Sequence, residues 1–530
     1  MYNRYDSRSS VIKNNFRKPS NLFVYTLNDS DYFCCLIANT IAFNMSQDKN
    51  HEHNGSLHLV IPTYGARFYE SSASKYPKIL KKIQLFLHYF RTEIRLRKSV
   101  KSKIDAYSTS FDTGSIKFCS PAKWLYFYFT SLIYFKLTQH LKAIKSIPLQ
   151  DLITTYKVRE ILSGDLIADT YIRFKPAAKI NLKDKFIKDI IIRSHALHRL
   201  YSSILIKQKS QSISYYGCYS TYIQNGIPLR IASTIAKQCF TFGNPCKFTK
   251  KHQSSNLSNG YLTDMPNHWE YLMGSTDQDS EIIELAAKSL YHRIKGSYDR
   301  TMYYMNSSNK SGLENSVRER LKENRVLMLH DFFDASNVYR WKLYPDFYTW
   351  ASHTIELCIK NNLDLFVKPH PNQIKEGQAV ISQLQEKYKE ANNILWIESE
   401  VPNHIIFNSC PSLCITLFGS VVAEAAYLGT PVLLAGDHPA LNFDLGFTAK
   451  SLEEYESYLI NPLTKYDPEL RNRAAKFIAQ HYKHILKNNL DPLISHFGLS
   501  FQDLERDSSL LKSKEVTEYI KTSLYECHKL

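Results

Sequence analysis

The chain has 530 residues, of which 44% are hydrophobic and 22% are charged, and its formal net charge is +17. This composition excludes a disordered or collagen-like chain, and the length is sufficient for two large α/β domains. The cysteines form no CxxC pair and no metal-ligand spacing, so we expect neither a disulfide framework nor a zinc site. The positive charge favours an anionic partner: a phosphorylated substrate, a nucleic acid or an anionic membrane surface.

The N-terminal part begins with a polar stretch that has no features of a secretory signal, which predicts a cytoplasmic protein. Two predicted strands, 21–27 and 57–62, flank a predicted helix at 32–45. The basic run at 91–103 is interpreted either as a solvated helix face or as part of a surface for anions.

The segment WLYFYFTSLIYF, residues 124–135, is rich in aromatic residues and is predicted to be helical. It is too short to span a membrane, because a span takes about 20 apolar residues. The first interpretation is a buried helix. The alternative is a helix in the membrane interface, with Lys123 and Lys136 at its ends and its rings among the lipid headgroups.

The string ILSGDLIADTYIRF, residues 161–174, carries Asp165, Asp169 and Arg173 at i, i+4 spacing, so a helix would place all three on one face. A carboxylate pair can act as a general base, which makes Asp165 and Asp169 candidate catalytic residues. The alternative is a salt-bridge ladder on the surface.

Further on, residues 224–243 are expected to form a loop, a helix and a strand. Arg230 is interpreted there either as a phosphate or acceptor contact or as an exposed charge.

The C-terminal half alternates short apolar runs with helical stretches. Such alternation predicts a parallel sheet with helices on both faces, and ligands bind such sheets beyond the carboxyl ends of the strands. His330, Lys368, His370 and Gly419 all lie at or just past predicted strand ends. The predicted strands are 326–330, 365–368, 394–397, 414–418 and 432–435, and the predicted helices are 350–360, 376–390, 402–408 and 421–428.

We place a domain border near residue 320. Residues 1–320 are predicted to form an α/β domain with helical insertions. Residues 321–490 are predicted to form a second α/β domain, and residues 491–530 a helical tail.

In FVKPHPN, residues 366–372, two prolines fix the backbone around His370. Lys368 and His370 then project from a stiff strand end, where they could hold a diphosphate or a leaving phosphate. His370 could also donate a proton to that phosphate, which makes it a third candidate catalytic residue. The alternative is a structural turn in which His370 satisfies the backbone.

The loop LHDFFDASN, residues 329–337, places His330 and Asp331 directly after a strand, where they could bind donor or acceptor. The alternative is a turn in which Asp334 and Ser336 cap a helix. The His and Asp spacing matches no metal signature, so no metal is expected.

The segment GSVVAE, residues 419–424, follows another strand and opens a helix, whose N-terminus attracts phosphate. Gly419 and Ser420 are therefore candidate phosphate contacts. Glu424 lies on an otherwise apolar helix and needs a partner, for which a ribose diol would serve. The alternative is an ordinary helix–strand unit without a ligand.

In their order along the chain, the motifs HDFFDA, VKPHPN and LFGSVVAEAAYLGTPVLLAGDHPA resemble bacterial surface and capsule polysaccharide glycosyltransferases of GT-B type. The order is also similar to that of the polysialyltransferase and CDP-glycerol glycerophosphotransferase families, and the likeness covers residues 160–440. Many polysialyltransferase-type relatives have paired serines where this chain has Gly419 and Ser420.

The resemblance implies an α/β protein with two Rossmann-like domains that face each other across a cleft, a GT-B-like arrangement. It implies that residues 1–320 form the acceptor side and that residues 321–490 bind the nucleotide donor. It implies that Lys368 and His370 contact the donor phosphates, that Ser420 binds phosphate and that Glu424 holds ribose. Such enzymes usually need no metal.

The predicted function is a metal-independent glycosyltransferase that moves a sugar from a nucleotide-sugar to a growing cell-surface polysaccharide or a lipid-linked acceptor. It would act in the cytoplasm or as a peripheral protein at the inner face of the plasma membrane. The nucleotide-sugar is its substrate, and no further cofactor is expected.

The alternatives are a nucleotide-sugar epimerase or a glycerophosphotransferase of similar architecture. A nucleic-acid-binding protein is a third, but the sequence has no zinc finger, helix-turn-helix or aromatic RNA-binding signature, so we expect no nucleic acid as partner.

Overall fold

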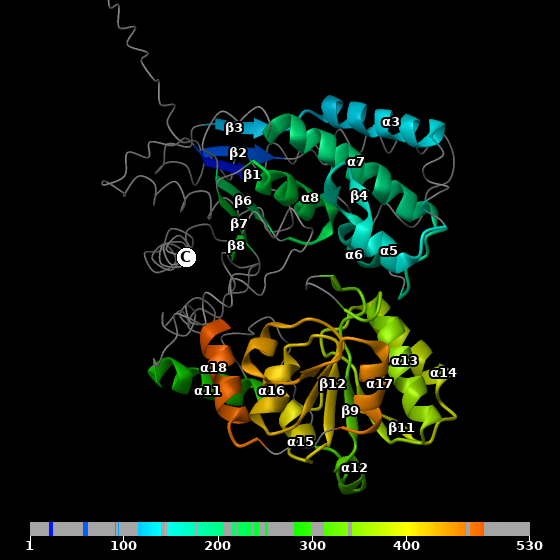
Figure 1. Cartoon of the computed structure of the whole chain (residues 1–530), viewed down its shortest axis with the longest axis vertical. Helices are drawn as coiled ribbons and strands as arrows, with labels where there is room; N and C mark the ends of the chain where they lie inside the picture. Colours follow the sequence, from blue (N-terminus) through cyan, green and yellow to red (C-terminus); the bar gives the residue numbers. More distant parts are fainter. Residues whose placement is uncertain are drawn as a thin grey trace, which may run out of the picture.

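The structure is a computed structural model of the chain. It describes residues 21–24, 57–61, 91, 94, 115–138, 144, 146–175, 178–205, 214–218, 220–235, 238–242, 250–252, 280–297, 312–337, 342–462 and 467–481. These residues form two units, each built on a six-stranded sheet, stacked along the long axis of the molecule (Figure 1). The helix predicted at 32–45 and the tail predicted at 491–530 lie outside the described residues.

The sheet of the first unit has the strand order β3-β2-β1-β6-β7-β8. The pairing of β7 with β8 is antiparallel, and the other pairings are parallel. Counted within the sheet, the order is 3-2-1-4-5-6, the doubly wound order of dinucleotide-binding folds. The strands are β1 (Asn21–Val24), β2 (Leu57–Ile61), β3 (Ser115–Phe118), β6 (Ser214–Cys218), β7 (Gln238–Phe242) and β8 (Lys250–His252).

The first unit also contains helices that pack beside its sheet. Helix α8 begins at Tyr222 and keeps Pro228 inside it, so the loop expected from residue 224 is helical instead. Contacts with α6, described below, hold this first turn. The remaining elements are α3 (Pro121–Leu137), α5 (Leu149–Thr155), α6 (Gly164–Phe174), α7 (Lys185–Leu205), α8 (Tyr222–Ser233) and a small hairpin of β4 (Lys157–Val158) and β5 (Ile161–Leu162).

The sheet of the second unit is wholly parallel, with the order β11-β10-β9-β12-β13-β14. Counted within the sheet, this is again 3-2-1-4-5-6. The predicted α/β class with a parallel sheet is therefore confirmed. The strands are β9 (Arg325–Met328), β10 (Leu365–Lys368), β11 (Ile394–Trp396), β12 (Leu413–Thr416), β13 (Val432–Leu434) and β14 (Phe447–Thr448).

Helices cover both faces of the second sheet: α13, α14 and α17 lie on one side, and α11, α15, α16 and α18 on the other (Figure 1). The helices are α11 (Ser280–Ile294), α12 (Asn315–Leu321), α13 (Phe347–Lys360), α14 (Lys375–Lys387), α15 (Asn403–Phe407), α16 (Val421–Tyr427), the 3-10 turn η5 (Pro439–Phe443), α17 (Leu452–Ile460) and α18 (Leu470–His481).

The two covered faces explain why the strand sequences are continuously apolar. Successive side chains of a strand point to opposite faces, so both sets are buried when helices cover both sides. In β9, Leu327 joins the core on the side of α13, whereas Val326 and Met328 join the core on the side of α16. Every residue of β9, β10 and β12 is buried.

The domain border near residue 320 stays a prediction. One helix that precedes it, α11, packs with the second unit. The apolar side chains of α11, among them Ala286 and Leu290, belong to the same core as α16 and α18. The other core contains buried residues of both units, such as Tyr171 of α6 and Trp350 of α13.

The expectation that residues 124–135 form a buried helix is corrected by the structure. These residues lie in α3, and only one face of that helix is buried. Trp124, Ser131 and Phe135 are buried, whereas other large apolar residues of the helix are exposed. Among the described residues, no helix is both long and apolar enough to cross a bilayer.

A buried hydrogen-bond network joins α13 to α17. The indole Nε1 of Trp350 donates to the hydroxyl of Tyr455 at 3.0 Å, and Thr354 Oγ1 lies 2.7 Å from the same hydroxyl. All three residues are fully buried. A buried donor that loses its acceptor costs free energy, so this network fixes how α17 sits against α13.

Tyr455→Phe should lower the free energy of unfolding by about 1–3 kcal/mol, because it leaves the Trp350 indole N–H without an acceptor. The measurement is chemical denaturation followed by circular dichroism. Tyr458→Phe is the matched control on the same helix: its half-buried ring stacks on Phe447 at 4.3 Å, and the expected change is within about 0.5 kcal/mol. Equal effects for the two variants would contradict a role for the network.

Candidate functional site

The order of the second sheet reverses between β9 and β12, and ligands of doubly wound sheets bind beyond the strand ends at this point. His330 follows β9, and Gly419 follows β12. His330 Nε2 lies 3.1 Å from Thr416 Oγ1, and the amide of Phe418 donates to the same nitrogen at 3.4 Å. The structure therefore brings two of the predicted site segments into direct contact.

His330 is held as a neutral imidazole in an aromatic setting. Its ring stacks on Phe347 with centroids 4.5 Å apart and lies 5.2 Å from the ring of Phe418. Burial, with His370 and His438 nearby, lowers the pKa of His330 to about 3. Because Nε2 accepts the Phe418 amide, the hydrogen-bond network assigns the proton to Nδ1. His330 can thus donate a hydrogen bond without carrying charge.

His370 bonds to the backbone of its own turn, as the alternative interpretation of this segment predicted. Its Nδ1 accepts the amide of Asn372 at 3.2 Å, which assigns the proton to Nε2. Burial, together with the charge of Lys368, lowers the pKa of His370 to about 4. At neutral pH this imidazole can donate a hydrogen bond through Nε2, but it is not an imidazolium that could protonate a leaving phosphate.

Lys368 does not project as an exposed cation. Its side chain is 3% exposed, and Nζ donates to the carbonyl of Ser399 at 3.1 Å. Burial lowers the pKa of Lys368 to about 8, while Glu424 and Glu400 oppose that shift. The predicted contact of Lys368 with donor phosphates therefore lacks geometric support, because the ammonium faces protein acceptors.

Glu424 has a partner, as expected for a carboxylate on an apolar helix, but the partners are protein side chains and not a ribose. Arg293 Nε on α11 lies 2.7 Å from Glu424 Oε1, and Asn403 Nδ2 donates to Oε2. The carboxylate and the guanidinium are both buried. A ribose would have to displace or join these contacts, so the ribose role stays a prediction.

Gly419 and Ser420 form the turn between β12 and α16. The amide of Gly419 donates to Thr416 Oγ1 at 3.0 Å. A Cβ at position 419 would lie 2.8 Å from that oxygen and 3.3 Å from His330 Cε1, so glycine is needed for this close approach. Ser420 is exposed, and its hydroxyl makes no capping hydrogen bond. That hydroxyl is available to a ligand.

Asp331 and Asp334 organise the loop after β9. Asp331 Oδ1 accepts the amide of Phe333 at 3.1 Å, and Asp334 Oδ1 accepts the amide of Ala335 at 2.9 Å. Burial in the surrounding protein raises the pKa of both carboxyls. The loop is a turn, as the alternative predicted, but Asp334 and Ser336 cap no described helix, because α13 begins at Phe347 and is capped by Asp346. Contact of Asp331 with a donor remains a prediction.

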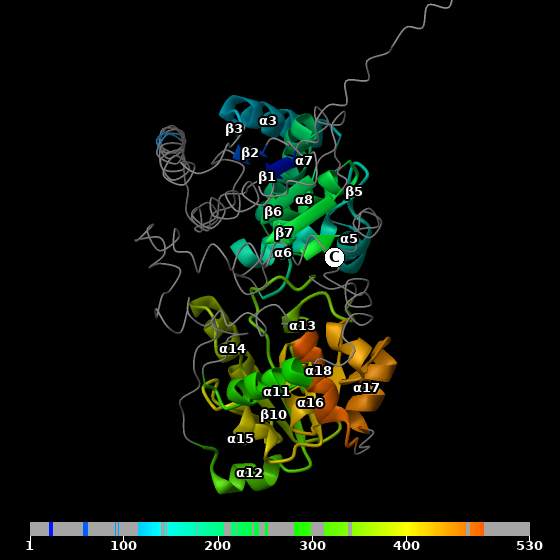
Figure 2. The ribbon, with the colours of Figure 1, turned by 90° about the vertical axis from the view of Figure 1, so that its left-hand side faces the viewer.

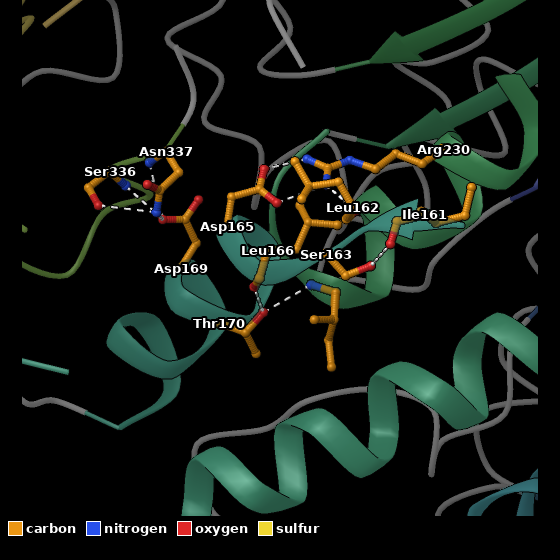
Figure 3. Close-up of polar contacts among 11 residues, drawn as sticks. Ile161, Leu162, Ser163, Asp165, Leu166, Asp169, Thr170, Arg230, Ser336 and Asn337 are labelled. Carbon is orange, nitrogen blue, oxygen red and sulfur yellow. Dashed lines mark hydrogen bonds and ion pairs between the residues drawn. The ribbon is translucent and has the colours of Figure 1, made fainter. Parts of the chain in front are cut away.

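Asp165 is paired with Arg230 inside the first unit (Figure 3). Arg230 is fully buried and bonds both carboxylate oxygens of Asp165, and it also donates to the carbonyl of Leu162 at 2.5 Å. Both interpretations of Arg230, a ligand contact and an exposed charge, are therefore wrong.

Further contacts between α6 and α8 hold the same arrangement. Thr170 Oγ1 donates to the carbonyl of Leu166 and accepts the amide of Ile223, at 2.6 and 2.9 Å (Figure 3). A Cβ at Gly226 would lie 2.4 Å from the side chain of Leu166, so a glycine lets the helices approach. These contacts explain why the first turn of α8 is helical.

Asp169 reaches from α6 across to the second unit. Its Oδ1 accepts hydrogen bonds from the amides of Ser336 and Asn337, at 3.0 and 3.2 Å, and from Asn337 Nδ2 at 2.6 Å (Figure 3). Asp169 is 1% exposed. Burial raises its pKa to about 7, although Lys342 opposes the shift. Asp165 and Asp169 are thus near one another, as predicted, but they have different partners.

Lys342 belongs to this cluster and was missed by the sequence analysis. Its Nζ donates to Ser336 Oγ and to the carbonyl of Pro345, each at 2.7 Å. Burial lowers the pKa of Lys342 to about 8, against the opposing effect of Asp169. Nothing in the string YRWKLYP distinguishes this lysine from an exposed one, because its burial depends on a loop of the same unit and a helix of the other.

Thr416, Arg293 and Asn403 were also missed, and each contacts a predicted site residue. A signal existed for Thr416, a polar residue at the end of an apolar strand. No sequence signal indicated Arg293, because it is distant in sequence from Glu424, which it contacts. Within the described ranges, no group of three or more His, Cys, Asp or Glu residues is placed to hold a metal ion.

No protein-family model matches the chain, and no curated protein matches it significantly. Solved structures are weakly similar over most of its length. They include a UDP-GlcNAc 2-epimerase from Neisseria meningitidis bound to UDP-GlcNAc, with 12% identity, coverage of 89% of this chain and 100% of that chain, and a TM-score of 0.25.

HepE of Anabaena in complex with UDP-glucose has 9% identity, coverage of 88% and 99%, and a TM-score of 0.28. The spinosyn rhamnosyltransferase SpnG, complexed with thymidine diphosphate, has 9% identity, coverage of 87% and 96%, and a TM-score of 0.24. TM-scores this low establish neither a shared fold nor a shared activity. The fold assignment rests on the strand orders.

The stability of the protein should depend on pH through Asp169. Its pKa of about 7 in the folded chain lies above its ordinary value, so its contribution to stability is full at low pH and is lost as pH rises through 7. Asp169→Asn keeps an acceptor oxygen and does not ionise. The Tm of this variant relative to wild type should therefore rise between about pH 5 and about pH 8.

The measurement is thermal unfolding at both pH values. Asp151→Asn, at an exposed position on α5, controls for the exchange of a carboxylate for an amide. A Tm difference for Asp169→Asn that does not change with pH would show that this carboxyl is ionised throughout, against the desolvated setting described here.

Proposed function

We propose that the chain is a glycosyltransferase that binds a nucleotide-sugar at the carboxyl edge of the second sheet. The observation that carries the proposal is the contact of His330 with Thr416 at the point where the strand order reverses. In doubly wound sheets this is where nucleotides bind. The resemblance of the motif order to GT-B glycosyltransferases supports the same assignment.

The donor phosphates would be held by neutral hydrogen-bond donors. His330 Nδ1–H and His370 Nε2–H are fixed as donors by their backbone contacts, and the exposed Ser420 hydroxyl follows Gly419, which approaches the His330 ring. Donors fixed in advance need no reorganisation as negative charge develops on the leaving phosphate. Lys368 is buried and bonded to a backbone carbonyl, and it would not contact the ligand directly.

In the reaction, an acceptor hydroxyl attacks the anomeric carbon of the donor sugar. The new glycosidic C–O bond forms as the bond to the nucleotide phosphate breaks, and the nucleotide phosphate leaves with the electron pair. The hydroxyl proton goes to a base. A carboxyl with a pKa near neutral pH suits this role.

Asp169 is the proposed base, since its pKa lies at about 7. The three hydrogen bonds that it accepts all reach Oδ1, and no described residue donates to Oδ2. Asp165 is assigned a structural role, because Arg230 occupies both of its oxygens. The first unit would then supply the acceptor side, with a saccharide or lipid-linked acceptor near α6.

Ser420→Ala should weaken nucleotide binding without changing the Tm of the protein alone. The lost hydrogen bond to a charged phosphate corresponds to a roughly tenfold or larger rise in Kd. The measurement is a thermal-shift titration with CMP, CDP, UDP, GDP and dTDP, in which the nucleotide that binds raises Tm. Ser457→Ala, an exposed serine on α17, is the control and should leave the shift unchanged. If no nucleotide raises Tm, the proposed function is wrong.

Asp169→Asn should keep the nucleotide-induced shift but lose transfer activity by about 100-fold or more. The assay uses sugar conjugates of the nucleotide that raises Tm. It measures release of that nucleotide with and without saccharide acceptors. Release that needs an acceptor supports a glycosyltransferase. Conversion of the sugar without any acceptor would identify an epimerase and overturn the transfer proposal. Full activity of the variant would exclude Asp169 as the base.

A further inference from the structure

Helix α3 carries a continuous apolar stripe on its outer face. Tyr126, Phe129, Ile133 and Leu137 are 60%, 53%, 53% and 76% exposed, and Tyr134 beside them is 49% exposed. Their spacing of three or four residues places them along one side of the helix. Of the ten large apolar residues that are exposed in the described part of the chain, five lie on this helix, so the exposure is concentrated here.

The opposite face of α3 is anchored on α7, which fixes the direction of the stripe. The hydroxyl of Tyr128 donates to Asp189 Oδ1 at 2.6 Å, and Phe135 packs edge-on against His195 with centroids 4.7 Å apart. Arg199 donates to Thr130 Oγ1 at 2.5 Å. The stripe is therefore presented outward by a packed helix, and it is not the exposed side of a loose segment.

The position of α3 also favours an external partner. The helix lies at the end of the first unit that is farthest from the second unit, in both views of the molecule (Figures 1 and 2). The candidate site at the carboxyl edge of the second sheet is thus separate from this surface. A partner on α3 need not block nucleotide binding.

The charges around the stripe are positive. Helix α3 contains Lys123 and Lys136 and has no acidic residue. The guanidinium of Arg199 lies over the rings of Tyr126, a stripe residue, and Phe127, at 5.9 and 4.9 Å. Exposed aromatic and aliphatic side chains beside lysines suit the surface of an anionic bilayer, because the rings favour the headgroup region and the ammonium groups attract the lipid charge. The net charge of +17 has the same sign.

We propose that the outer face of α3 docks on an anionic lipid bilayer. Tyr126, Phe129, Ile133 and Leu137 enter the headgroup region, and Lys123 and Lys136 attract the lipid charge. Tyrosine and phenylalanine suit this depth because their rings are mostly apolar while the tyrosine hydroxyl stays in contact with water. This inference stands independently of the proposed function, since it uses none of the residues of the candidate site.

The test is co-sedimentation of the full chain with vesicles of phosphatidylcholine alone or mixed with phosphatidylglycerol. Wild type should bind the mixed vesicles, and added salt should weaken the binding. The triple variant Phe129→Ser, Ile133→Ser, Leu137→Ser should lower the apparent affinity about tenfold or more, because it removes most of the inserted apolar area. The pair Lys123→Gln, Lys136→Gln should reduce the preference for phosphatidylglycerol roughly tenfold.

The control variant is Tyr291→Ser, Leu452→Ser, which removes exposed apolar side chains from α11 and α17 in the second unit. It should bind vesicles like wild type. Circular dichroism and the Tm of each variant alone check that the fold is intact.

Three outcomes would overturn the proposal. The first is no binding of wild type to either kind of vesicle, and the second is binding by the triple variant equal to that of wild type. The third is a dimer in sedimentation velocity that the triple variant dissociates, which would assign the stripe to a second copy of the chain.

Discussion

A buried carboxylate of the first unit is hydrogen-bonded to a loop of the second unit. Asp169 of the first unit accepts three hydrogen bonds from Ser336 and Asn337 in the loop after β9, and the contact is buried. The same loop begins at His330, which stacks in the aromatic setting at the end of the sheet. The geometry at the carboxyl edge of the second sheet therefore depends partly on a residue of the other unit. Since Asp169 has a raised pKa, its protonation state affects both stability and the proposed chemistry.

Several charged residues near the proposed site are occupied by other parts of the protein. Asp165 is paired with Arg230, Glu424 with Arg293, and Lys368 with a backbone carbonyl. A buried ion needs such partners, because desolvation otherwise disfavours its charged form. Under the proposed function, the donor phosphates would meet uncharged donors, namely two imidazoles and a serine hydroxyl. A site of this kind recognises an anion through directed hydrogen bonds in a setting with little water.

The proposed docking surface of α3 lies at the end of the first unit that is farthest from the second unit. Its apolar stripe cannot be explained by packing, because the packing face of the helix already contacts α7. Docking by this face would bring the first unit against a bilayer, where lipid-linked acceptors are found. The proposed transfer and the proposed docking are thus compatible, although each rests on different residues.

The sequence by itself determined the strands and helices of the second unit from β9 to β13. The hydrophobic period, the length of a segment and its turn residues are local properties that the sequence shows directly. For this reason β10 coincides with the predicted strand at 365–368, and α16 ends one residue before the predicted bound of 428. Because parallel strands end at one edge, the sequence also indicated that His330 and Gly419 lie close together. Tertiary structure alone decided which polar residues are available. Arg230, Arg293 and Lys342 contact residues far away in sequence or are buried by loops, and no local pattern records such pairing. For the same reason, the composition of α3 could not reveal that only one face is buried, because that face is defined by α7.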